Sequence, residues 1–158
     1  MLREHHVREG IDPAKHPNDE ASMRQLRATY YGMISEVDHQ IGRIMAALAA
    51  SGDYDNTLIV FTSDHGEQLW DHWMLGKECI FDQGFHIPLI IRAPGATAEG
   101  ARGHTVDGFT ENIDLMPTIL ASLGGEAPLQ CDGRSLTPFL EGRTPADWRR
   151  EGHWEIDF

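Results

Sequence analysis

The longest regular pattern of apolar positions runs from about residue 20 to residue 51. Apolar side chains recur there at steps of three and four, at Leu26, Tyr30, Met33/Ile34, Val37, Ile41, Ile44/Met45 and Leu48. This spacing places them on one face and predicts a long amphipathic helix. Asn18 or Asp19 suits the N-cap, and Gly52 suits the position after the last helical turn.

Two continuous apolar runs follow the predicted helix, at residues 57–61 and about 87–92. Unbroken runs of this kind are typical of strands that are covered on both faces, as in a parallel sheet. Two weaker patterns favour further strands: "HTVDGF", which starts at His104, and the closing "HWEIDF". The second pattern alternates apolar and polar residues, as a half-buried strand does.

Helical patterns return after the second apolar run. "NIDLMPTILASLGG" predicts a helix with Asp114 as its cap and Pro117 in its first turn, where a missing N–H costs nothing. "CDGRSLTPFLEG" predicts a turn and a short helix. Helices and strands in alternation indicate an α/β fold with a mainly parallel sheet flanked by helices. Such sheets place ligands at the carboxyl ends of their strands.

The polar residues after the first apolar run are the candidates for chemistry. Asp64 and His65 lie side by side, and Gly66 after them permits a backbone turn that lets both side chains reach one metal ion. Carboxylate oxygen and imidazole nitrogen together suit Zn, Mn or Fe, whereas calcium sites normally use oxygen ligands alone. Lys77 adds a point charge suited to a sulfate or phosphate group. The pattern therefore predicts a metal and oxyanion site.

Each candidate also has a structural interpretation. An Asp-His pair is more often a surface turn, and a single lysine such as Lys77 is more often solvated. His72 is either a substrate contact or a packing group between Trp70 and Trp73. Two ligands do not make a metal site, and the neighbouring acids are too close in sequence to complete one, so the missing ligands point to protein outside this stretch. These acids are Glu67, Asp71, Glu78 and Asp82.

Composition and charge narrow the range of partners. The net charge of −12 argues against nucleic acid or an anionic membrane, and no stretch reaches the ~18 apolar residues of a membrane span. Cys79 and Cys131 form neither a CxxC pair nor a disulfide framework, which favours a reducing compartment such as the cytoplasm. The polar amino end predicts no signal peptide. The sequence leaves the localisation of the protein undecided, and formation of a homo-oligomer is possible.

Several motifs together resemble the later part of the sulfatase family, in the alkaline-phosphatase superfamily. They are Val-Asp-x-x-Ile-Gly at 37–42, Gly-x-x-Asp-Asn-Thr at 52–57, Ser-Asp-His-Gly-Glu at 63–67, and Gly76-Lys77. "IPLIIRAPG", "NIDLMPTIL" and "DGRSLTPFL" follow in the family's order. The resemblance implies an alkaline-phosphatase/sulfatase-like fold, present as the carboxyl-terminal portion of one domain. Residues 1–19 are expected to be irregular, 20–142 to form the family-like core and 143–158 to form a tail.

The resemblance also implies roles for the candidate residues. Asp64 and His65 correspond to the two metal ligands from this half of the family's sequence, and Lys77 to the lysine that contacts the bound sulfate or phosphate group. Many members have Asn after the Asp and bind calcium. His65 is closer to the phosphonate monoester hydrolase and phosphodiesterase branch, which favours a transition metal such as manganese. Calcium remains an alternative, because some true sulfatases also carry Asp-His.

The chain departs from the family in lacking its nucleophile motif, Cys/Ser-x-Pro-x-Arg. Neither Cys79 nor Cys131 has proline two positions later. The resemblance therefore implies hydrolysis of small anionic sulfate, phosphonate or phosphate esters, with the formylglycine nucleophile in a missing part and the isolated chain inactive. Two alternatives stay open: a phosphoethanolamine-type transferase, and a non-catalytic metal-binding fragment.

Overall fold

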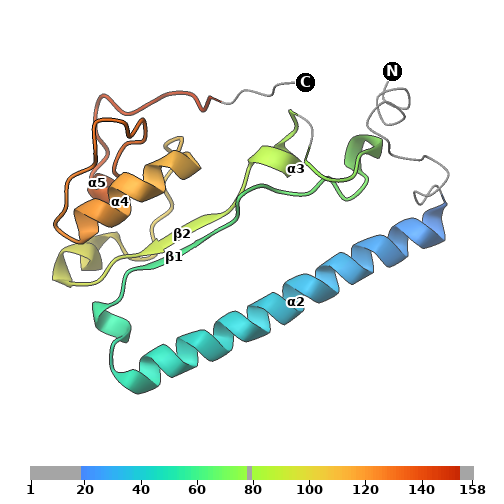
Figure 1. Cartoon of the computed structure of the whole chain (residues 1–158), viewed down its shortest axis with the longest axis horizontal. Helices are drawn as coiled ribbons and strands as arrows, with labels where there is room; N and C mark the ends of the chain where they lie inside the picture. Colours follow the sequence, from blue (N-terminus) through green and yellow to red (C-terminus); the bar gives the residue numbers. More distant parts are fainter. Residues whose placement is uncertain (1–18, 78–79, 154–158) are drawn as a thin grey trace. The chain divides into compact units, whose positions relative to one another are not determined.

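The computed structural model describes residues 19–77 and 80–153 of the 158-residue chain. Contacts within the chain define two compact units, and Figure 1 labels helices and strands of both. The first unit consists of Met1–Gly52 and Ser63–Pro88, and the second of Asp53–Thr62 and Leu89–Phe158. None of the described helices is long and apolar enough to cross a membrane.

Helix α2 (Glu20–Ser51) dominates the first unit and is drawn as one unbroken ribbon in Figure 1. Asp19 is its N-cap, because the Asp19 Oδ1 atom accepts a 2.9 Å hydrogen bond from the Ser22 backbone N–H. This bond stabilises the carboxylate and lowers the pKa of Asp19. Gly52 ends the helix in the left-handed region, at φ 81°. The predicted helix and both of its ends are confirmed.

The described remainder of the first unit, residues 63–77 and 80–88, is mostly loop. It contains a 3₁₀ turn at Asp71–Trp73 and helix α3 (Asp82–Phe85). Arg27 of α2 donates a 3.2 Å hydrogen bond from Nε to the Leu69 carbonyl oxygen and lies 3.7 Å from the Asp71 carboxylate. The helix is therefore attached to the loop that carries the candidate site.

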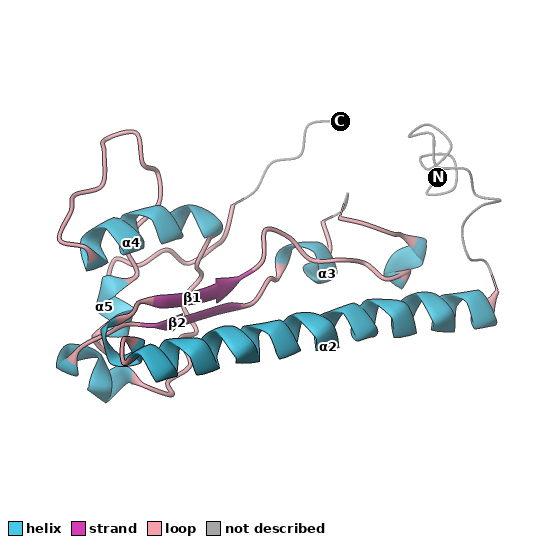
Figure 2. Ribbon diagram, turned by 60° about the horizontal axis from the view of Figure 1, so that its bottom comes forward, coloured by secondary structure: helices cyan, strands magenta, loops and turns pink. Residues whose placement is uncertain are grey.

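The second unit contains a two-stranded sheet of β1 (Ile59–Thr62) and β2 (Leu89–Arg92), seen side by side in Figure 2. The strands pair antiparallel, with Phe61 opposite Ile90. The expected parallel sheet is therefore wrong for this pair. An apolar run in the sequence indicates that a strand is buried, but the direction of the strand depends on the segment that connects it to its neighbour. Parallel neighbours need a long crossover, usually a helix. The described part of the connection between β1 and β2 contains no helix longer than the four residues of α3.

One face of this sheet packs against the core of the second unit, and the other face carries exposed apolar side chains. Leu89 and Ile91 contact the buried side chains Leu136, Phe139 and Trp148. On the opposite face, Phe61 is 41% exposed and Ile90 63% exposed. The expectation of strands covered on both faces is therefore not met within the described residues.

Helices α4 (Leu115–Ser122) and α5 (Thr137–Leu140) form beside this core, as predicted. The Phe139 and Trp148 rings meet edge to face, with centroids 4.7 Å apart. Short 3₁₀ helices lie at Tyr54–Asn56, Ala96–Ala101 and Asn112–Asp114. The predicted strand at "HTVDGF" does not form, and most of the predicted strand "HWEIDF" lies outside the described residues.

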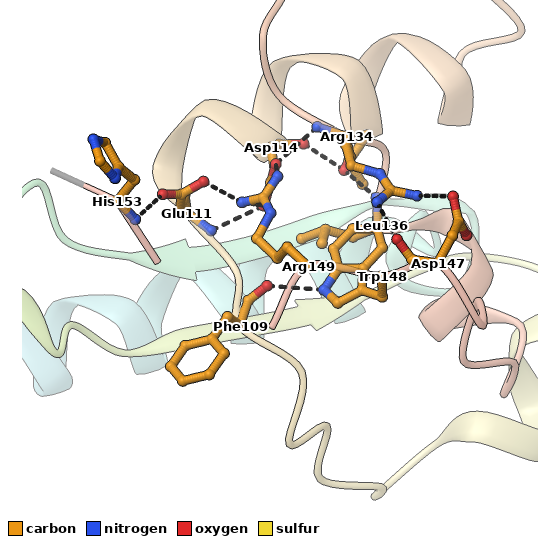
Figure 3. Close-up of polar contacts among 10 residues, drawn as sticks. Phe109, Glu111, Asp114, Arg134, Leu136, Asp147, Trp148, Arg149 and His153 are labelled. Carbon is orange, nitrogen blue, oxygen red and sulfur yellow. Dashed lines mark hydrogen bonds and ion pairs between the residues drawn. The ribbon is translucent and has the colours of Figure 1, made fainter. Parts of the chain in front are cut away.

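A buried carboxylate, Asp114, organises the polar part of the second unit (Figure 3). Its Oδ2 and Oδ1 atoms accept hydrogen bonds of 2.9 and 2.7 Å from the Arg149 guanidinium. They also accept bonds from the backbone N–H groups of Glu111, at 2.9 Å, and Arg134, at 2.8 Å. Asp114 is the N-cap residue of α4, as predicted, but its side chain makes no capping bond to that helix. The side chain instead connects the segment at Glu111 with Arg134 and Arg149, which lie 20 and 35 residues after Asp114.

Replacing Arg149 with methionine should destabilise the second unit strongly. The substitution keeps an apolar stem but leaves the fully buried Asp114 carboxylate without its countercharge, a loss of roughly 3–5 kcal/mol. Urea unfolding should measure the change in the free energy of unfolding. Arg143→Met is the control, because Arg143 pairs with Glu141 at the surface, where a pair contributes about 0–1 kcal/mol. Equal effects of the two substitutions would contradict the role of the buried pair.

Candidate functional site

The four candidate residues all belong to the loop of the first unit that follows β1 in the chain. Asp64 and His65 open this loop, His72 lies in its 3₁₀ turn, and Lys77 comes after Gly76. The Asp64 side chain is 86% exposed and the His65 side chain 38% exposed. Lys77 is also exposed. These side chains are therefore accessible to a ligand and do not pack in a hydrophobic core.

Asp64 and His65 face each other across a short gap. The Nε2 atom of His65 lies 3.4 Å from the Oδ2 atom of Asp64, and the His65 backbone N–H donates a 3.0 Å bond to Asp64 Oδ1. The other ring nitrogen, Nδ1, lies 2.8 Å from the Gly66 carbonyl oxygen. In the neutral ring, a proton on Nδ1 satisfies that contact and leaves the lone pair of Nε2 directed to the Asp64 side.

This arrangement fits two ligands of one ion. Ligand atoms about 2.0–2.1 Å from a tetrahedral ion lie roughly 3.3 Å from each other, close to the observed separation. A metal-bound histidine commonly donates its second ring N–H to a carbonyl, as Nδ1 is placed to do toward Gly66. Within residues 19–77 and 80–153, however, no three His, Cys, Asp or Glu side chains are grouped closely enough to hold an ion.

The surroundings of Asp64 favour its ionised form. The hydrogen bond from the His65 backbone N–H is the largest cause that lowers the pKa of Asp64 below its ordinary value of 3.8. Electrostatic interactions with His65 and Lys77 lower this pKa further, while desolvation acts in the opposite direction. Asp64 therefore favours the anion more than an ordinary carboxyl group does.

Gly66 allows the loop to close behind the pair. Its N–H donates a 2.8 Å hydrogen bond to the Gly84 carbonyl oxygen. A Cβ atom at Gly66 would overlap the Gln83 carbonyl oxygen and lie 2.9 Å from the Gln83 carbonyl carbon. Gly66 does not have a positive φ. Glycine is therefore needed here because two backbone segments approach closely, and not because the chain makes a left-handed turn.

The acids near the pair are used to hold the loop. Glu67 Oε1 accepts backbone hydrogen bonds from Leu69, at 3.2 Å, and Gly76, at 2.7 Å. Asp71 accepts a 3.0 Å bond from the Gln83 side chain and also faces Arg27. The interpretation that these acids do not complete a metal site is consistent with these contacts. The bond from Gly76 to Glu67 spans nine residues, which local sequence patterns do not reveal.

His72 lies in a strained part of the loop. Its ring stacks on Phe81 with centroids 3.7 Å apart and planes 10° apart, and the residue is exposed. Leu69, Trp70 and His72 all have positive φ, at 47°, 72° and 53°, a region that side chains other than glycine seldom adopt. Strain of this kind is often found at functional sites. Phe81 is the packing partner, which the sequence did not indicate.

Comparison with known proteins identifies the class to which this fold and motif belong. The family model "Sulfatase" matches residues 7–125 of the chain. PehA of Trinickia caryophylli, a multifunctional alkaline phosphatase superfamily protein, is 54% identical over 140 residues. That match covers 89% of this chain and 27% of PehA. The chain belongs to the sulfatase family.

Two solved structures give the same result. The phosphonate monoester hydrolase of Agrobacterium radiobacter is 50% identical, with a TM-score of 0.82 over 87% of this chain and 27% of that one. A protein solved with its substrate D-glucosamine-2-N,6-O-disulfate is 32% identical, with a TM-score of 0.69 over 94% of this chain and 30% of that one. The chain therefore spans about a quarter of the length of the relatives it matches.

Gly66→Ala should destabilise the first unit, because the added methyl group meets backbone atoms that cannot rotate away. We expect a loss of roughly 1–3 kcal/mol, measured by thermal or urea unfolding. Gly42→Ala is the matched control. A Cβ at Gly42 meets nothing within 4 Å on α2, so the same change there should stabilise the helix by roughly 0.5–1 kcal/mol. Effects of the same sign at both positions would refute the close-approach argument.

Proposed function

We propose that this chain supplies part of the metal and oxyanion site of an enzyme that hydrolyses sulfate esters or phosphonate and phosphate esters. The geometry of Asp64 and His65 carries the proposal, because Oδ2 and Nε2 lie 3.4 Å apart with both side chains accessible. The chain's place in the sulfatase family supports it. The rest of the ligand set and the nucleophile would come from protein outside these residues.

Each residue has a separate task in this proposal. Asp64 provides an oxygen ligand that stays ionised, and His65 provides Nε2 while the Gly66 carbonyl fixes the orientation of its ring. A divalent ion held there would supply positive charge for the oxygens of the transferred group. Manganese, zinc or iron suit one oxygen and one nitrogen ligand better than calcium does. Lys77 places its ammonium beside the same oxygens, and exposed His72 lies on the same loop as a substrate contact.

Phosphonate monoesters are the substrate class we favour within this proposal. The phosphonate monoester hydrolase of Agrobacterium radiobacter is 50% identical to this chain, whereas the protein that binds the sulfated glucosamine is 32% identical. A substrate of either class is a small anion, yet the chain carries a net charge of −12. Local positive charge from Lys77 and the metal would therefore be needed to bind it.

His65→Ala should weaken metal binding by the 158-residue chain at least ~10-fold, the scale for losing an interaction that supports a metal site. Zn²⁺ titration followed by the NMR signals of the loop would measure this. His39→Ala is the control, because His39 is exposed on α2 and should leave the loop signals unchanged. Equal zinc affinity of His65→Ala and the unaltered chain would remove His65 from the site.

A chimera tests the reaction itself. Residues 20–142 would replace the matched segment of PehA, and hydrolysis of a phosphonate monoester and a sulfate ester would be compared. We expect activity in the chimera and none in the 158-residue chain alone. Lys77→Ala in the chimera should lower kcat ~10²-fold, the scale for one charge-stabilising group. Arg43→Ala, an exposed change on α2, is the control. An unchanged kcat for Lys77→Ala would exclude Lys77 from the mechanism.

A further inference from the structure

We infer that Glu67 is a positioning residue: its carboxylate closes the loop between itself and Gly76 and thereby sets where Lys77 lies relative to Asp64 and His65. The inference rests on the proposed function of those three residues. Glu67 acts through the backbone, because its carboxylate binds the N–H groups of Leu69 and Gly76.

The hydrogen bonds of the loop support this role. A single carboxylate oxygen, Glu67 Oε1, accepts from the backbone N–H groups of Leu69, at 3.2 Å, and Gly76, at 2.7 Å. The Gln68 N–H donates a 3.0 Å bond to the Gly76 carbonyl oxygen. These bonds tie both backbone groups of Gly76 to the start of the loop. Lys77 is the next residue, so its Cα position follows directly from this closure.

The loop needs such a restraint because its backbone is strained. Leu69, Trp70 and His72 are held at positive φ between the two ends that Glu67 connects. Residues in these conformations persist only where the surrounding contacts hold them. Hydrogen bonds from N–H groups to an ionised carboxylate are among the stronger ones in proteins. The lysine stem is flexible, so the closure fixes the Cα from which this stem reaches toward Asp64 and His65.

Asp71 also holds this loop, but through different contacts, so an experiment can separate its role from that of Glu67. Asp71 binds the side chain of Gln83 and faces Arg27, and its contacts attach the turn at the far end of the loop to α2 and α3. Glu67 binds the residue that precedes Lys77. Loss of Asp71 should loosen the loop as a whole, whereas loss of Glu67 should displace Lys77.

Amide hydrogen exchange tests the closure directly in the 158-residue chain. Glu67→Ala should raise the exchange rates of the Leu69 and Gly76 amides about tenfold, because each N–H loses its acceptor. Glu67→Gln keeps a carbonyl oxygen and should restore most of the protection. Asp82→Ala, an exposed acid in the same unit, should leave both amides unchanged. Unchanged exchange of the Gly76 amide in Glu67→Ala would overturn the inference.

A double-mutant cycle tests whether Glu67 acts through Lys77. The probe is inorganic sulfate, titrated by calorimetry against the chimera that carries residues 20–142 in PehA. We expect Glu67→Ala and Lys77→Met each to weaken sulfate binding, by about tenfold, and the double variant to be no weaker than Lys77→Met alone. Glu67→Gln should retain most of the affinity.

The outcomes separate the two proposals. Sulfate affinity that is absent in the unaltered chimera, or unchanged in its Lys77→Met variant, would overturn the proposed function of Lys77 and with it the role inferred for Glu67. Weakening by Lys77→Met without any effect of Glu67→Ala would overturn the role of Glu67 alone. Additive effects of the two substitutions would do the same, because they would show that Glu67 does not act through the lysine.

Discussion

The close contact of Gly66 with the backbone of Gln83 and Gly84 is the constraint on which the candidate site depends. Only a residue without a side chain fits there, and the contact brings the beginning of the long loop against its later part. The Gly66 carbonyl oxygen is also the group that faces His65 Nδ1. One glycine thus fixes the path of the loop and, through its carbonyl, the orientation of the imidazole beside Asp64.

The two units use carboxylates in opposite ways. Asp114 is fully buried, and its ion pair with Arg149 and two backbone N–H groups repay the cost of removing the charge from water. Asp64 is exposed and keeps most of its hydration, so it can exchange water for a ligand at little cost. Glu67 lies between these cases: a partly buried acid that shapes the backbone. Burial, rather than residue type, separates structural acids from those available to bind.

Features that depend on residues close together in the chain could be predicted from the sequence. The bounds of α2 follow from helical periodicity, the Asp19 cap and Gly52, which are all local signals. Strands β1 and β2 formed within two residues of the apolar runs, yet their antiparallel pairing was not predicted, because direction depends on the connection. A motif made Asp64, His65 and Lys77 candidates, and their roles stay a proposal. The contacts of Glu67 with Gly76 and of Asp114 with Arg149 were not predicted, because these partners lie nine and 35 residues away.

The sheet of the second unit has a consequence for how this chain meets other polypeptides. Among the described residues it has only two strands, so each strand has one edge that no further strand covers, and Phe61 and Ile90 stand exposed on one face. A pair of strands is marginal by itself in water, and an open edge is a template that an added strand can extend. A strand added at either edge would extend the sheet and pair with the outer backbone groups of β1 or β2.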